Sequence, residues 1–260
     1  MLSYFNLLGS GLTAPPWDSV LPIREELFGM ERLQEHAVTL AAAQKVSTTP
    51  PRVVSLQSRL KQNADVLLAA YKDNAKELAF SQSIVPAAEW LLDNYHLVEQ
   101  QIREVQDDLP SGYYRQLPKL ACGPFIGYPR VFGIAWAFVA HTDSYFNEDD
   151  FCKFIQAYQS VTPLTIGELW ALAITMRIVL VENLRRLVDQ ITVGREDRKD
   201  AEQLTDRLLI SGSANSVLLS DIETRSTGPL SVTFAAELAK GLRDQDPRTT
   251  PALEWLERRL

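Results

Sequence analysis

Apolar residues recur at intervals of three and four along most of this chain, which is the spacing of an amphipathic α-helix. One such row consists of Leu56, Leu60, Ala64, Leu67, Tyr71, Ala75 and Leu78. A second row follows Pro86, a residue that suits a first helical turn because its missing N–H needs no partner there. The two rows predict a long helix over 56–78 and another that begins near Pro86 and stops at Pro110 and Gly112.

The segment 163–191 is predicted to be the most apolar long helix, because it has apolar rows on two sides. Thr165 and Glu168 fit a capping box, so the regular helix is expected to start there. Gly194 is expected to separate this helix from the ones that follow. The remaining predicted helices cover about 129–141, 148–160, 197–220, 229–243 and 251–260, with Asn147 as the N-cap of the second and Asp150 in its acidic first turn.

These elements predict an all-α fold, a bundle of about eight to ten helices. Residues 1–50 are interpreted as an N-terminal helical extension and 51–260 as the main helical domain. Residues 111–130 hold three Pro and three Gly, interleaved with aromatic and aliphatic residues. That composition predicts an ordered loop rather than a flexible linker.

Composition narrows the classes of function. The net charge is −7, which gives no general attraction to nucleic acid or to anionic lipid. The longest apolar run, Val131–Ala140, is half of the ~20 residues that a membrane helix needs. The first residues show no basic region and no cleavage site of a signal peptide, and Cys122 and Cys152 lack metal-ligand spacing. We therefore expect reduced thiols and a cytoplasmic location.

Few residues suggest chemistry. His36, His96 and His141 are far apart, so neither a metal site nor a catalytic residue is predicted. His141 and Asp143 could meet in a turn that follows a helix, where a structural hydrogen bond is favoured over a ligand pair or a general base with its orienting group.

Charged residues in the apolar segment 163–191 are the next clue. Arg177 interrupts this segment and needs a carboxylate partner, or several carbonyl groups, to offset its desolvation. Glu168 is the predicted partner in a structural ion pair that ties helices together, with Glu182, Asp143 and Glu89 as alternatives. Glu182 and Arg186 stand four residues apart and are expected to form an ordinary surface pair.

Aromatic residues concentrate between positions 113 and 158. Core packing explains most of them, but sugar-binding surfaces also combine aromatic faces with charged side chains. Within the predicted loop, Tyr114, Arg115, Tyr128 and Arg130 are the candidates for exposed, functional positions. Together with His141 and Asp143 they form the predicted binding residues, either for a sugar or for another domain.

Several long strings are specific enough to identify a family resemblance. They are "AEWLLDNYHLVEQQIREVQDDLP", "GYYRQLPKLA", "GYPRVFGIAWAFVAHTDS" and "LTIGELWALAITMRIVLVENLRRL", in this order between residues 88 and 187. They resemble the N-terminal part of cyclic β-1,2-glucan synthases, which are large bacterial membrane glycosyltransferases. The beginning and the end of the chain resemble the same family.

The resemblance implies an activity for a whole synthase: transfer of glucose from UDP-glucose, with a divalent metal, into a β-1,2-linked glucan that is then cyclised. The transferase motif QxxRW of such enzymes is absent from this sequence, so no catalytic residue and no cofactor is assigned to this chain. The expected role is therefore that of a scaffold, or of a segment that guides the glucan. It is expected to lie on the cytoplasmic side of the bacterial inner membrane. Its expected partners are the remaining domains of the synthase and β-1,2-glucan.

Two other functions stay open. The first is a stand-alone helical interaction module without sugar chemistry. The second is an all-α enzyme with its own site around His141, Asp143 and Glu168. The final segment starts like a helix, with Thr250 as N-cap and Pro251 at the first position, and it has no terminator. This feature predicts that the helical domain is truncated at its C-terminal end.

Overall fold

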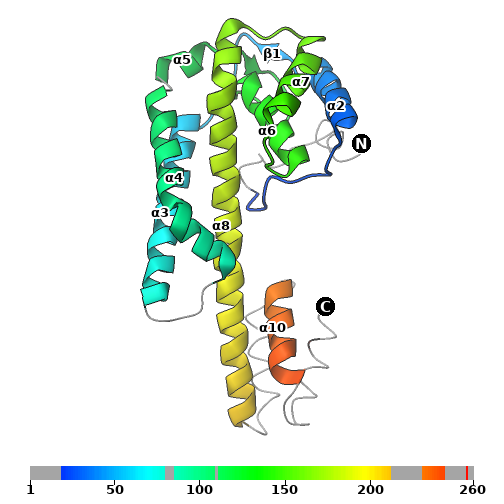
Figure 1. Ribbon diagram of the computed structural model, residues 1–260. Coiled ribbons are helices and arrows are strands. Elements are labelled where there is room, and N and C mark those ends of the chain that lie inside the picture. The colour runs from blue at the N-terminus through cyan, green and yellow to red at the C-terminus, as the bar shows by residue number, and fades with distance from the viewer. Residues whose placement is uncertain (1–18, 80–84, 109–110, 212–229, 244–255, 257–260) are drawn as a thin grey trace. The chain divides into compact units, whose positions relative to one another are not determined.

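The computed structural model describes residues 19–79, 85–108, 111–211, 230–243 and 256. Within these ranges the chain is almost entirely helical, which confirms the all-α prediction (Figure 1). The described helices are α2 (Met30–Ala43), α3 (Leu56–Ala79), α4 (Pro86–Asp108), α5 (Ser111–Gln116), α6 (Arg130–Thr142), α7 (Glu148–Gln159), α8 (Ile166–Ser211) and α10 (Val232–Arg243). The predicted helix 251–260 lies outside the described residues, apart from Leu256.

The predicted helix starts are confirmed at two caps. Asn147 accepts a hydrogen bond from the Asp150 amide at 3.1 Å, and α7 begins at the next residue. Thr165 and Glu168 form the capping box before α8: the Glu168 amide donates to Thr165 Oγ1 at 3.2 Å, and the Thr165 amide donates to Glu168 Oε2 at 2.9 Å.

Two details of the predicted pattern are wrong. The first six residues of the expected loop 111–130 form helix α5, because Gly112 does not outweigh the apolar anchors Tyr114 and Leu117 that bury against the core. Helix α8 continues through Gly194 rather than ending there. A single glycine costs a helix only about 1 kcal/mol, which neighbouring turns can offset.

The chain divides into two compact units, residues 1–189 and 190–260, instead of at the predicted boundary of residue 50. In the first unit α3 packs against α4, while α2 packs against α7 and α6 (Figure 1). Helix α6 is the centre of this unit, because every residue from Arg130 to His141 is buried. A helix that is apolar on all sides has to be surrounded by other elements.

A small pair of strands also belongs to the first unit. β1 (Val46–Ser47) pairs antiparallel with β2 (Lys119–Leu120), with Val46 opposite Leu120. Two residues are too few to produce a period-2 pattern, which is why the sequence did not reveal them. The pair fixes the loop 117–129, whose turns need positive φ angles of 83° at Gly123 and Gly127.

The second unit combines the last part of α8 with α10. Its apolar core is formed by Ala201, Leu204, Ala235, Leu238, Leu242 and Leu256. A Cβ atom at Gly241 would lie 2.8 Å from Thr205 Oγ1, so the two helices approach closely at this point. The glycine is therefore needed for packing.

Candidate functional site

The inner face of α8 carries polar side chains where apolar ones are expected. Glu168, Thr175 and Glu182 follow one another at intervals of seven and are 0%, 0% and 1% exposed. We call these three residues the inner polar row. Each of them has a buried partner from another helix, and these partners define how α8 is held in the first unit.

Glu182 is the centre of the largest network in the inner polar row. Its carboxylate accepts hydrogen bonds from Arg59 at 2.9 and 2.7 Å, from Asn63 at 2.8 Å and from Arg186 at 2.9 Å. A further bond comes from Arg185 at 3.0 Å. The predicted pair of Glu182 and Arg186 thus forms, but its expected place at the surface is wrong, because both side chains are at most 2% exposed.

Burial alone would raise the pKa of the Glu182 carboxyl. The hydrogen bonds from Arg59 and Asn63, together with the charges of Arg59 and Arg186, outweigh this effect and lower the pKa to about 2. Glu182 is therefore ionised at neutral pH. Arg186 also donates to the Leu21 carbonyl at 2.9 Å and lies 5.0 Å above the ring centre of Trp136. One carboxylate thus joins α3, α8 and, through Arg186, α6 and the segment before α2.

Glu168 forms the second buried ion pair of the inner polar row. It accepts from Arg130 Nε at 2.8 Å and from the terminal nitrogen of the same side chain at 2.7 Å. This bidentate pair links the first turn of α6 to the first turn of α8. Between the two carboxylates, the Thr175 and Tyr114 hydroxyls share a hydrogen bond of 2.7 Å.

The predicted ion pair of Glu168 with Arg177 does not form. The two residues are nine positions apart, or two and a half helical turns, which places them on opposite sides of α8. Arg177 instead lies 3.4 Å from Glu104 of α4, and their side chains are 39% and 37% exposed. The sequence correctly predicted a carboxylate partner but placed Arg177 on the wrong face.

The predicted loop residues have different surroundings. Tyr114 and Tyr128 are buried, at 9% and 6% exposed, and Arg130 is held in its pair with Glu168. Arg115 is exposed. Burial raises the pKa of the Tyr128 hydroxyl. These positions therefore serve the core, and Arg115 is the one among the four that is exposed to solvent.

His141 and Asp143 do not bond to one another. His141 is buried, and its Nδ1 donates to the Glu26 carbonyl oxygen at 2.7 Å, an atom that can only accept. Its ring stacks on Phe28, with ring centres 3.9 Å apart. Asp143 caps α6 in a left-handed conformation and pairs with Arg24 at 3.3 Å. Both residues thus fix the segment 23–28 against the end of α6.

His36 of α2 completes this aromatic cluster. Its ring centre lies 4.5 Å from that of His141 and 5.6 Å from that of Phe28. Burial, with a smaller contribution from His141, lowers the pKa of His36 to about 4. The sequence had placed these histidines far apart, and only the fold brings two of them together.

The outward face of α8 is apolar and open. Its residues step by four and three: Ile166, Trp170, Ala173, Arg177, Leu180, Leu184 and Leu187. We call these seven residues the outer row. Ile166 and Trp170 are each 76% exposed and Leu187 is 41% exposed, while Leu180 and Leu184 are half-buried and pack against the core of the first unit. Charge is therefore buried on one face of α8 while apolar surface is exposed on the other.

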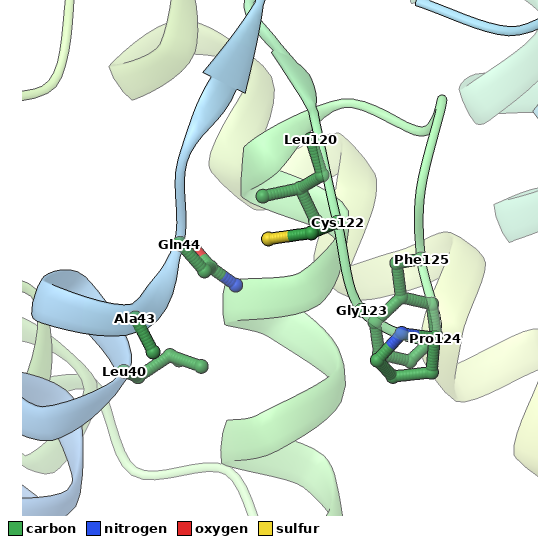
Figure 2. Close-up of a pocket in the computed structure, with 8 residues that line it drawn as sticks. All are labelled: Leu40, Ala43, Gln44, Leu120, Cys122, Gly123, Pro124 and Phe125. Atoms are coloured by element: carbon green, nitrogen blue, oxygen red, sulfur yellow. The ribbon is translucent and has the colours of Figure 1, made fainter. Parts of the chain in front are cut away.

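A small pocket lies where the end of α2 meets the 120–125 turn (Figure 2). It is lined by Leu40, Ala43, Gln44, Leu120, Cys122, Gly123, Pro124 and Phe125. Figure 2 shows the Cys122 thiol beside the Gln44 amide, with Leu40 and Phe125 forming apolar walls. Gln44 Oε1 accepts from the Tyr158 hydroxyl at 2.8 Å, so the amide is anchored to α7.

The described ranges contain no group of three His, Cys, Asp or Glu side chains that could hold a metal. They also contain no helix that combines the length and the apolar character needed to cross a bilayer.

The fold and the site together define the class of protein. It is an all-helical region with buried ion networks and an exposed apolar row. The chain is 33% identical over 240 residues to the cyclic beta-(1,2)-glucan synthase NdvB of Rhizobium meliloti (strain 1021). The match covers 92% of this chain and 8% of that synthase. The resemblance to this family is confirmed over nearly the full chain. No family model matches the chain.

Proposed function

We propose that this chain is a helical scaffold region of a cyclic β-1,2-glucan synthase and that it lies on the cytoplasmic side of the inner membrane. The observation that carries the proposal is the 33% identity to such a synthase across 92% of the chain. In the whole enzyme, UDP-glucose and a divalent metal would be used by other domains. This region would supply a rigid surface on which those domains assemble.

The buried networks support a scaffold role. Glu182 and Glu168 each join helices that are far apart in sequence, because Arg59 is 123 positions and Arg130 is 38 positions away. Buried ion pairs contribute little net stability, but a partner in the wrong place leaves an uncompensated charge. Such pairs therefore favour one arrangement of the helices, which is what a fixed docking surface requires.

A region exchange tests the proposal in the enzyme as it exists. The matched region of the Rhizobium meliloti synthase would be replaced by this chain, and glucan formation from UDP-glucose would be measured in membranes. We expect the exchanged synthase to make cyclic glucan and a synthase without the region to make little. Glu182→Leu in the exchanged region should lower both protein and product, whereas Tyr145→Ser, at a 70% exposed side chain, should change neither.

Two results would contradict the scaffold role. Normal synthesis by the enzyme that lacks the region would show that no scaffold is needed. Glucan formation by the isolated chain with UDP-glucose and Mg²⁺ would show that the region is catalytic.

The two exposed thiols allow a test of sidedness. Cys122 and Cys152 are both exposed and unpaired by disulfide. In intact cells a membrane-impermeant maleimide should leave them unlabelled, and it should label them once the inner membrane is opened. A variant with both residues changed to Ser gives the background signal. Labelling in intact cells with a permeable outer membrane would overturn the proposed location.

A further inference from the structure

We propose that the outer row of α8 binds one amphipathic α-helix from outside this chain, and that this helix carries an acidic side chain opposite Arg177. The row repeats with the alternating four and three spacing of a coiled-coil seam over residues 166–187. Helices that pair along such a seam insert their side chains between those of the partner. We therefore take a helix, rather than a strand or a small molecule, as the occupant of this row.

The exposure along the row shows that the described residues of the first unit leave its N-terminal half uncovered. Trp170 and Ile166 stand one turn apart and are each 76% exposed, and Leu169 beside them is 40% exposed. Single exposed apolar residues are ordinary, but contiguous ones that include a tryptophan are typical of interaction sites. Further along, Leu97 of α4 is 50% exposed. It stands two turns before Glu104, the residue that reaches Arg177, and so lies on the same face of α4.

Arg177 determines the charge of the partner. It stands at the middle of the row, with three apolar positions on either side. Its contact with Glu104 is 3.4 Å long and more than a third exposed on both sides, so it contributes little. A helix that covered the row would desolvate the guanidinium, and a partner carboxylate would offset that cost together with the long contact to Glu104. The structure therefore favours a partner with Asp or Glu at its central seam position.

The same residue argues against a second copy of this chain. In a two-fold dimer each row would meet itself in reverse, and the central position of one copy would face that of the other. Two Arg177 guanidinium groups would then be buried side by side. Parallel pairing in register brings the same two charges together. A single charge at the centre of an apolar seam is a known device for specifying the partner.

The source of the helix, another segment of a synthase, rests on the proposed function, whereas the chemistry of the row does not. The test therefore uses designed peptides and the full 260-residue chain. Two labelled amphipathic helices of about three heptads would differ at one central position, Glu in the first and Lys in the second. Binding would be followed by fluorescence anisotropy.

We expect the Glu peptide to bind at least about tenfold more tightly than the Lys peptide, because like charges in a buried seam oppose association. Arg177→Glu should reverse that preference. Trp170→Ser combined with Ile166→Ser should weaken the Glu peptide about tenfold or more while circular dichroism stays unchanged. Tyr145→Ser is the matched exposed control and should bind as the unchanged chain does.

Absence of binding by both peptides would overturn the inference, and so would an unchanged preference in the Arg177→Glu variant. A dimer in sedimentation that Trp170→Ser abolishes would also overturn it, in favour of a second copy. If the exchanged enzyme makes glucan but the chain binds neither peptide, this inference alone is contradicted. Peptide binding without synthesis by the exchanged enzyme would contradict only the proposed function.

Discussion

The two faces of α8 between residues 166 and 187 both carry exceptions to the usual arrangement, since three polar residues are buried beside the apolar core residues of this helix and several apolar residues are exposed. The inner polar row is almost fully buried, and each of its members is hydrogen-bonded to another helix. The outer row is mostly apolar, and its first two residues are largely exposed. The buried charges fix the place of α8 in this chain, and the exposed apolar surface is where we propose that a partner helix binds.

The largest expected effect is that of removing the Glu182 carboxylate from the buried face of α8. Glu182→Leu leaves Arg59 and Arg186 without their buried counter-charge, which we expect to cost about 3–5 kcal/mol of unfolding free energy. Arg177→Leu on the outer face should cost less than about 1 kcal/mol, because its ion pair is exposed. Urea unfolding measures both. Equal losses in the two variants would remove the distinction between the faces.

A fall in pH should destabilise the fold through His36, a half-buried residue of α2, nearly as much as the loss of Glu182 does. The pKa of His36 is lowered to about 4 in the folded protein, against an ordinary value of 6.5. The unfolded chain binds the proton first, so stability falls as the pH drops from 6.5 towards 4, by about 3 kcal/mol in all. Unfolding midpoints measured between these pH values follow the change. His36→Gln should flatten this part of the profile, and a slope that persists would assign it to another group.

A substitution in the capping box tests the contribution of the N-terminal end of the inner polar row. Thr165→Ala removes the hydroxyl that accepts from the Glu168 amide, while the pair of Glu168 with Arg130 remains. We expect a loss of about 1 kcal/mol in unfolding free energy. Thr165→Ser keeps the hydroxyl and should retain most of the stability. A loss as large as that of Glu182→Leu would mean that the cap also orients the ion pair.

The outer row should be the least sensitive in the isolated chain. Trp170→Ser changes a side chain that is 76% exposed, and we expect an effect within about 0.5 kcal/mol on stability. Thermal unfolding of this variant beside the unchanged chain measures the difference. A loss of several kcal/mol would mean that Trp170 is covered within the chain, and the outer row would then be a core surface.

Much of the local structure could be predicted from short-range spacing. The start of α4 at Pro86, the Asn147 cap and the Thr165 capping box depend on residues at most four positions apart, whose relative geometry a helix determines. The candidate site could not be predicted in this way. Glu182 and Arg186 have the same spacing as an exposed pair, and their burial depends on Arg59, Asn63 and Leu21, all more than 100 positions away.

By itself, the sequence determined that the chain is helical, where several helices begin and which family it resembles, because these properties are local or are carried by contiguous strings. The tertiary structure decided which charges are buried. It buried Glu182 and Arg130 and left Arg177 at the surface, since burial depends on the helices that lie opposite. It also decided that Ile166 and Trp170 of the outer row are exposed, since no described helix lies opposite them.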